Sequence, residues 1–356
     1  MISAFQIIRK IIYGFMPNRK ELSFIMEVRN TDIIEKKYIL LDWNVIKYLK
    51  NPRNSTDEEL KTLINNLRPK YEFPFCESHL RDLATSYSPE NRDRIDDDIS
   101  FFKELSHETV IAYDNEKFFL VKNNSINNLF NEILAERSEI PNFTAETAPQ
   151  ITAQVDMNKL NDNHPLSDVL SSTHGQITPA LMADFFNDSF EKVFSEKNFY
   201  KNFRDCIQNL PTNMQQFIPD NLSDQDVFVI KHSIPFLKAL EIQTEDELKS
   251  VWKDVIFNWM QMKYPPNSNI PFDDLVTTSY TMLDLHPLFQ EKLKNNKNTL
   301  SNIVRDSKIA LYASGAKYFI TEDKSCYKKI KFIFQIYNVN CHVLKISEFV
   351  QRFNIV

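Results

Sequence analysis

Carboxylates that follow two apolar runs are the residues of this chain best suited to chemistry. Asp42 follows the apolar residues 38–41, and Asp323 comes two positions after the run YFIT at 318–321. Each run is typical of a buried strand. In open α/β sheets the ligand crevice lies at the carboxyl ends of the strands. Two aspartates at that edge indicate a metal site, and a metal there indicates phosphodiester chemistry.

Asp42 has two explanations that the residue alone does not separate. A carboxylate after a buried strand is costly unless it is paired or bound to a cation, which favours a metal ligand. Alternatively, Asp42 caps a helix that begins at Trp43. Asn44, two positions further on, points the same way in a tight strand-to-helix turn. We therefore expect Asn44 to orient a carboxylate or a water.

Asp306 is the strongest candidate for a functional acid. On a helix expected at 299–314, its neighbours at helical spacing are Ile303, Ala310 and Ala313, so the aspartate interrupts an apolar stripe. A capping role does not explain an acid in the middle of a helix. Because an unneutralised buried charge is destabilising, a functional role is favoured over a structural one.

Three further residues complete the candidate site. Asp323 either binds a metal or caps the next helix, and Thr321 is placed to give a hydroxyl to the same site. Asp82, in the helical segment SHLRDLATSY, is an ordinary helix acid when considered alone. In contrast, Asp273 and Asp274 are expected on a solvated helix face after a proline.

The elements that must position these residues fall into three zones. Residues 38–114 alternate strands and helices, including an expected strand EFPFC at 72–76, which indicates parallel pairing with crossovers. Residues 115–295 are mainly long helical stretches, and residues 296–356 return to the first pattern. We predict one discontinuous α/β domain, 38–114 and 296–356, with an all-helical insertion at 115–295. Residues 1–37 are expected to be an extension with an amphipathic helix.

Composition excludes several classes of protein. The 356 residues carry a formal net charge of −6, which argues against nonspecific coating of nucleic acid, because such affinity comes from clustered lysine and arginine. Lys328, Lys329 and Lys331 form one local basic cluster, which a solvated helix face would also explain. The three glycines are too few for glycine-rich phosphate loops, and Gly315 is expected at a helix C′ position with positive φ. The four scattered cysteines favour reduced thiols and a cytoplasmic protein.

Two parts of the chain resemble the PIN-domain nucleases. LDWNVIKYL is similar to the opening strand and helix of that family, and SHLRDL to its second acidic helix. DSKIALYASGAKYFITEDKSCYKKI is similar to its closing block, and CHVLKISEF to its last strand and short helix. The likeness covers about 120 residues in two pieces. It has three departures: Trp43 stands where a small or hydroxyl residue is usual, Asp82 where glutamate is usual, and compact members lack the long insertion.

The resemblance implies a PIN-like three-layer fold with a central parallel sheet and a metal-dependent endonuclease. Asp42, Asp82, Asp306 and Asp323 would hold Mg²⁺ or Mn²⁺, since hard oxygen ligands suit these ions. Asn44 and Thr321 would assist, and Lys328 and Lys329 would bind the nucleic acid. RNA is favoured over DNA as the substrate.

Two other functions remain open from the sequence. One is a catalytically inactive PIN-like scaffold, whose acids cap helices and whose helical insertion engages a protein or nucleic-acid partner or a second copy of the chain. The other is a phosphatase-like hydrolase that uses the same ions on small substrates. Trp252 and Trp259 in the insertion are expected to pack in a core rather than to stack on bases.

Overall fold

The computed structural model describes most of the chain as a series of separate ranges. The described residues are 33–34, 36–114, 116–122, 125–136, 196–208, 224–265, 268–291 and 300–354, with isolated pieces between 153 and 192. The helix expected near the N-terminus lies outside the described residues.

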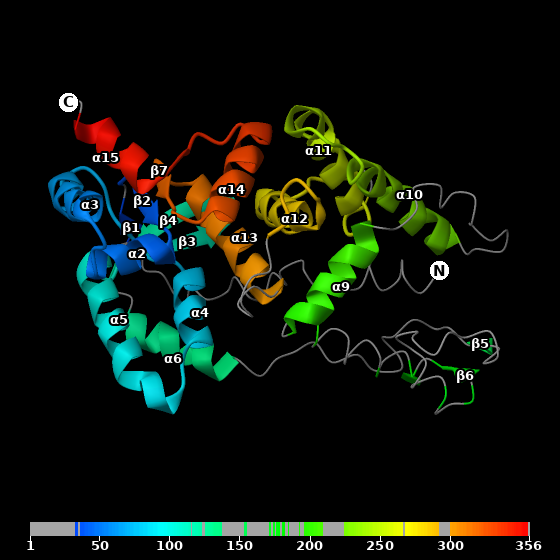
Figure 1. The fold of residues 1–356 in the computed structure, drawn as a ribbon, viewed down its shortest axis with the longest axis horizontal. Helices are drawn as coiled ribbons and strands as arrows, with labels where there is room; N and C mark the ends of the chain where they lie inside the picture. Colours follow the sequence, from blue (N-terminus) through cyan, green and yellow to red (C-terminus); the bar gives the residue numbers. More distant parts are fainter. Residues whose placement is uncertain are drawn as a thin grey trace.

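A parallel sheet of three strands joins the two ends of the chain. The strands are β2 (Ile39–Leu41), β7 (Tyr318–Ile320) and β8 (His342–Leu344), in the order β2-β7-β8. Leu41 aligns with Ile320, and Ile320 aligns with Leu344, so the three carboxyl ends meet at one edge. Helices surround this sheet (Figure 1), and the molecule is mixed α/β and mostly helical, as the sequence predicts at this level.

Alternate residues of the strands face two different hydrophobic cores. Ile39, Leu41 and Ile320 pack in one core, whereas Leu40 and Phe319 pack in the other. This period of two is the geometry of a strand, and it explains why the runs are apolar without interruption. Both faces of the sheet are therefore covered.

Helices that follow β2 build the layer on one side. They are α2 (Trp43–Lys50), α3 (Ser55–Leu67), α4 (Glu77–Thr85) and α5 (Arg92–Ser106), with a 3₁₀ turn at Pro89–Asn91. The strand expected at 72–76 is reduced to two isolated bridges, Glu72 with Tyr38 and Phe75 with Val110. Pro74 stands between them and lacks the backbone N–H that a continuous ladder needs.

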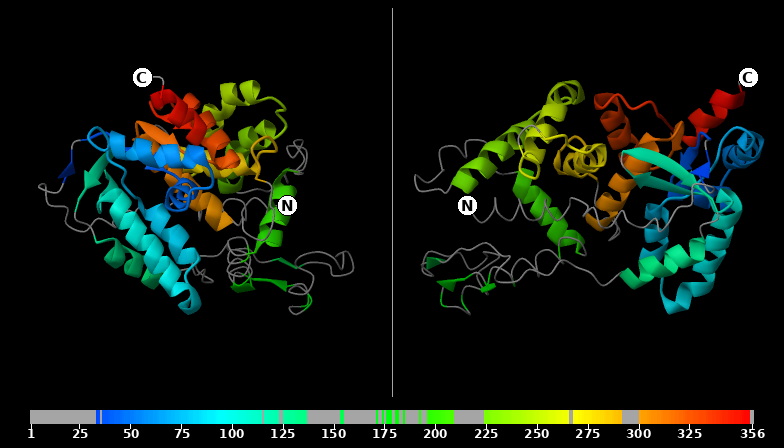
Figure 2. Two further views of the ribbon diagram at one scale, coloured as in Figure 1. Left: turned by 60° about the vertical axis from the view of Figure 1, so that its left-hand side comes forward. Right: turned by 180° about the vertical axis from the view of Figure 1, so that it is seen from behind.

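A hairpin runs across the expected start of the insertion. Strands β3 (Val110–Asp114) and β4 (Lys117–Val121) pair antiparallel, and β1 (Ile33–Ile34) pairs with β4. The right-hand view of Figure 2 shows this hairpin from behind. The helix α6 (Ile126–Glu136) then packs on α4. Strand β4 and helix α6 thus pack with the first part of the chain.

In the remaining middle of the chain, the described residues are mainly helical and include the short pair β5 (Ala153–Gln154) and β6 (Gln176–Ile177). Its helices are α9 (Lys197–Gln208), α10 (Asp224–Ala239), α11 (Glu245–Met260) and α12 (Phe272–Leu285). Trp252 and Trp259 are buried in the core, as expected. Within the described ranges, no helix is both long enough and apolar enough to cross a membrane.

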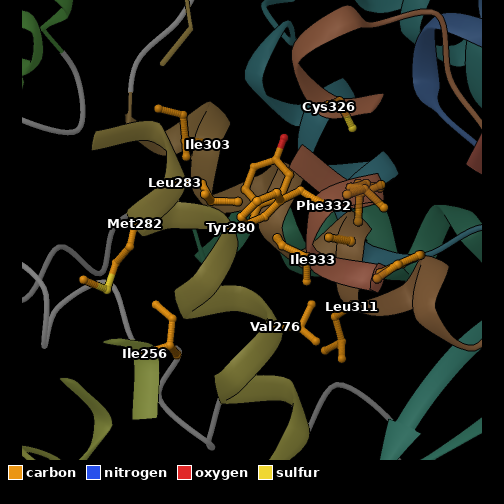
Figure 3. Packing of buried hydrophobic residues seen from close by; sticks show 14 of the residues in the cluster. Ile256, Val276, Tyr280, Met282, Leu283, Ile303, Leu311, Cys326, Phe332 and Ile333 are labelled. Atoms are coloured by element: carbon orange, nitrogen blue, oxygen red, sulfur yellow. The ribbon is translucent and has the colours of Figure 1, made fainter. Parts of the chain in front are cut away.

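Helix α12 packs against the closing block of the chain. That block contains α13 (Leu300–Ser314), α14 (Lys324–Ile336) and α15 (Ile346–Asn354). Figure 1 shows α12 beside α13 and α14, and Figure 3 shows Tyr280 of α12 among the buried side chains of these helices. The end of the expected insertion therefore shares a core with the sheet.

The position of α12 corrects the expectation for Asp273 and Asp274. Both are buried, with exposures of 7% and 4%, because α12 is enclosed along almost its whole length. The Asp274 carboxylate accepts hydrogen bonds from Lys263 Nζ at 2.7 Å and from the Tyr264 hydroxyl. These acids are structural rather than solvated.

Gly315 is required for a different reason from the one the sequence suggests. Its φ lies outside the left-handed region, so a helix C′ conformation does not explain it. A Cβ at this position would lie 2.5 Å from the Phe118 ring and 2.6 Å from the Tyr38 hydroxyl. The glycine allows the hairpin to approach the end of α13 closely.

Candidate functional site

The carboxyl edge of the sheet holds two of the predicted residues in direct contact. Asp42 follows β2, and its carboxylate accepts a hydrogen bond from the Thr321 hydroxyl at 2.7 Å. The Asp42 backbone N–H donates to the Ile320 carbonyl at 2.9 Å, which fixes the two strand ends together. Although Asp42 occupies the N-cap position of α2, its side chain makes no capping hydrogen bond. Capping therefore does not account for this carboxylate.

Asp323 joins the same edge but does cap a helix. Its Oδ1 accepts from the backbone N–H of Cys326 at 2.7 Å at the start of α14. Its own backbone N–H donates to the Thr321 hydroxyl oxygen at 3.1 Å. Thr321 is fully buried and links Asp42 to Asp323. The Asp323 side chain itself is exposed.

Asp82 and Asp306 reach this region from two packed helices, α4 and α13. Asp82 is paired with Arg305, whose Nε donates to Oδ1 at 2.8 Å. Asp306 is partly buried, and among the described residues its carboxylate has neither a hydrogen bond nor an ion pair. We call Asp42, Asp82, Asp306 and Asp323 the acid site.

The carboxylates of the acid site interact electrostatically. Burial raises the pKa of Asp306 well above its usual range, and the charges of Glu291, Asp82, Asp42 and Asp323 raise it further. Burial also raises the pKa of Asp42 to about 6, where Asp82 and Asp323 add to the effect and the Thr321 hydrogen bond opposes it. The site thus has an excess of negative charge, which a cation would relieve.

Burial raises the pKa of Asp82 as well, although Arg305 acts in the opposite direction. Arg305 is the one arginine or lysine that forms an ion pair with the acid site in the described part of the chain. A single guanidinium does not balance four carboxylates. The pairing makes Asp82 the acid least available to a metal ion.

The donors of the acid site match the oxygen ligands that Mg²⁺ and Mn²⁺ prefer. Across the described ranges, however, no three His, Cys, Asp or Glu side chains gather as a ready-made metal site. The hydroxyl of Tyr280 is fully buried beside the Cys326 thiol and has no other hydrogen-bond partner among those residues. Burial raises the pKa of Tyr280 well above its usual range, and the charges of Cys326, Asp306, Glu291 and Asp323 raise it further. A buried hydroxyl with no stronger partner than a thiol fits a region that takes a further polar group.

Asn44 lies in the first turn of α2, partly buried, two residues after Asp42. In the described part of the chain its side chain has no hydrogen bond and is available to a water or a ligand.

The structure separates the two predicted nucleic-acid-binding lysines. Lys328 is exposed; its Nζ donates to the Leu288 carbonyl at 3.1 Å and lies 3.6 Å from Glu245. Lys329 is fully buried, and its Nζ contacts Asp284 at 2.7 Å and Glu291 at 2.9 Å. The expectation that Lys329 binds a nucleic acid is therefore wrong, because the lysine faces inward from α14 toward α12.

Lys329 belongs to a closed group of charges. Asp284 also accepts hydrogen bonds from the Tyr200 hydroxyl at 2.5 Å and from Arg204 at 3.3 Å. We call Lys329, Asp284, Glu291, Arg204 and Tyr200 the Lys329 network. Glu291 raises the pKa of Asp306, so this network adjoins the acid site.

Sequence reasoning missed Arg305 and Glu291. A signal existed for Arg305, since a base next to Asp306 on the same helix is a natural partner for an acid on the helix packed against it. Glu291 stands outside any helix or strand in a polar segment, and its sequence neighbours give no signal of burial.

Comparison of the chain with protein-family models, with curated proteins and with solved structures finds no match. The function is therefore argued from the residues of the acid site.

Proposed function

We propose that the protein is a metal-dependent endonuclease of PIN-like fold that hydrolyses phosphodiester bonds, with RNA favoured over DNA. The observation that carries this proposal is the excess of carboxylates at the carboxyl edge of the parallel sheet, with Asp306 lacking a compensating partner. An unpaired buried carboxylate destabilises the folded state, so such an excess of negative charge favours a functional role.

The residues of the acid site take different roles in this proposal. Asp42 and Asp306 are the principal ligands of Mg²⁺ or Mn²⁺, and the exposed Asp323 adds a third carboxylate. Asp82 is paired with Arg305 and helps to orient the site rather than binding the ion directly. Thr321 holds the Asp42 carboxylate in place, and Asn44 orients a water. The bound ion supplies activation of that water and stabilisation of the leaving oxygen.

The setting is proposed to be the reducing cytoplasm. Cys76, Cys326 and Cys341 are free thiols. The helical part of the chain, α9 to α12, is proposed to contact a protein partner or a second copy.

A direct test measures metal binding and cleavage separately. Millimolar Mn²⁺ is expected to raise the thermal midpoint of the wild-type protein, since a ligand selective for the native state stabilises it. Asp306→Asn should abolish this shift, whereas Asp254→Asn, at an exposed position of α11, should retain it.

Cleavage is then measured on pools of tRNA, single-stranded RNA and DNA with Mn²⁺. The double variant Asp42→Asn with Asp323→Asn should lose cleavage of the pool that the wild type cuts. Cleavage at the wild-type rate by this variant would overturn the mechanism.

The alternative is a catalytically inactive PIN-like scaffold that binds a partner. Two observations favour it: Asp323 caps α14, and Arg305 neutralises Asp82. A scaffold would show no Mn²⁺-induced shift and no cleavage by the wild type.

A further inference from the structure

The carboxyl edge of the sheet carries a basic residue beside the acid site. Strand β8 ends at Leu344, and Lys345 is the next residue. Because the three strands are parallel and in register, Lys345 comes to the same edge as Asp42 and Thr321. Its Nζ donates to the backbone carbonyl of Asp323 at 3.1 Å. The ammonium group therefore lies next to the acid site.

The glutamates closest in the chain to Lys345 and Asp323 form no ion pair with this ammonium group, although the charge of Glu322 favours its protonated form. Glu322 accepts a hydrogen bond from the backbone N–H of Ile346 at 2.8 Å, and Glu348 accepts one from the backbone N–H of Lys345 at 2.7 Å. Both carboxylates thus satisfy the first N–H groups of α15. Lys345 forms no ion pair with a described carboxylate, so its charge is available to a ligand.

A second lysine shares an aromatic ring with Lys345. The Tyr327 ring centre on α14 lies 4.8 Å from Lys345 Nζ and 5.0 Å from Lys331 Nζ. Lys331 also donates to the Tyr327 hydroxyl at 3.0 Å, and its side chain is exposed. The ring thus contacts two ammonium groups, one partly buried beside the acid site and one at the surface, and its hydroxyl also lies 3.4 Å from the Glu348 carboxylate. They form a short basic track that leads away from the carboxylates.

We propose that Lys345 and Lys331 bind the phosphate backbone of a single-stranded nucleic acid and lead it to the acid site. This inference rests on the proposed nuclease function and names the strand that the site receives. Lysine ammonium groups bind phosphate as point charges, and here they offset the repulsion between phosphates and the acid site. A single strand is flexible enough to reach the partly buried Lys345, whereas a duplex is stiff over this length.

The test measures binding without cleavage. A labelled single-stranded RNA of roughly 20 nucleotides is titrated with the full chain in EDTA at several salt concentrations, and a DNA strand of the same sequence is a parallel arm. Lys345→Met keeps the length of the side chain and removes its charge. It should weaken binding and lower the slope of log affinity against log salt by about 0.7, the value for one phosphate contact to a single strand.

The double variant Lys345→Met with Lys331→Met should lower the slope by about 1.4, twice the value for one contact. Lys345→Arg should retain most of the wild-type affinity, because it keeps the charge. Lys253→Met, at an exposed position of α11, should leave affinity and slope unchanged. Circular dichroism on each variant checks that the fold is kept.

The outcomes separate this inference from the nuclease proposal. Wild-type affinity and slope in Lys345→Met would overturn the inference, even if cleavage still depends on Asp306. Lys345-dependent binding without a Mn²⁺ shift or cleavage would support the inference and overturn the nuclease proposal. A wild-type protein that binds neither strand overturns the inference outright.

Discussion

The acid site and the Lys329 network are adjacent groups of charged residues. Acids and bases are equal in number in the Lys329 network, whereas acids are in excess in the acid site. In the Lys329 network, Asp284 and Glu291 face Lys329 and Arg204, so two acids meet two bases. In the acid site, Arg305 forms an ion pair with Asp82, and no base of the described chain forms one with Asp42, Asp306 or Asp323. Asp284 and Asp306 lie on two helices, α12 and α13, that pack against each other. Their environments nevertheless move their pKa values in opposite directions.

The contrast teaches how to distinguish a structural acid from a functional one. Burial acts to raise the pKa of Asp284, but Lys329, Tyr200 and Arg204 together lower it below its usual range. Around Asp306 burial has no such compensation, and every named neighbouring charge is another acid. A buried acid that forms ion pairs with bases stabilises the packing of helices. A buried acid without such a partner favours the binding of a cation.

The largest change in stability is expected when the central base of the Lys329 network is removed. Lys329→Met leaves Asp284 and Glu291 buried without their shared cation, so we expect the free energy of unfolding to fall by about 3–5 kcal/mol. Urea denaturation measures it. The matched control, Lys328→Met, removes an exposed lysine and should cost less than about 1 kcal/mol. Equal effects of the two variants would contradict the contrast.

The pH dependence tests the imbalance at Asp42. Its pKa is raised to about 6 in the folded protein, whereas an unfolded aspartate titrates near roughly 3.9. The folded state therefore holds this proton more tightly, and stability is lost as the pH rises from 4 through 6. Relative to Asp42→Asn, wild type should lose roughly 2 kcal/mol of unfolding free energy between pH 4 and 7 without divalent ions. A constant difference between the two proteins would show that Asp42 has no raised pKa.

Asp306→Asn should act in the opposite direction to Lys329→Met. Removing an uncompensated charge is expected to raise the free energy of unfolding by about 1–2 kcal/mol at pH 8 in EDTA. Urea denaturation compares it with the exposed control Asp254→Asn, which should change stability by less than about 0.5 kcal/mol. Destabilisation by Asp306→Asn would mean that this carboxylate has a structural partner.

The smallest test concerns the link between the strand ends. Thr321→Val removes the hydroxyl that bonds Asp42 and the Asp323 backbone, and should cost about 0.5–1 kcal/mol of unfolding free energy. Because that bond lowers the pKa of Asp42, the variant should also shift the pH dependence described above to higher pH. Thr321→Ser keeps the hydroxyl and should match wild type in the pH titration.

The elements at both ends of the chain could be predicted because their signals are local. The apolar runs before Asp42 and through 318–321 fit strands that are covered on both faces, and each ends in polar residues. The helix around Asp306 was predicted within a residue of its bounds. Its interrupted apolar stripe correctly indicated an acid in a costly environment.

What the sequence could not supply were partners from distant segments. Lys329 and Lys328 have nearly the same neighbours in the sequence. The burial of Lys329 depends on Asp284 and Glu291, which lie 45 and 38 positions away. Gly315 is required by Phe118, which belongs to the hairpin. The argument used for Asp306 does not extend to Asp284, because the residue three positions before it is Thr281 and its helix ends at Leu285.

The pairing of β2 with β7 also governs the order of events during synthesis. Ile39 aligns with Tyr318, so the β7-facing edge of β2 has no partner until residues 318–320 have been synthesised. Contacts this distant in sequence slow folding, and an unpaired apolar strand edge promotes aggregation. Nascent chains that end before residue 318 are therefore expected to be chaperone clients, and the helices of the middle region have time to form first.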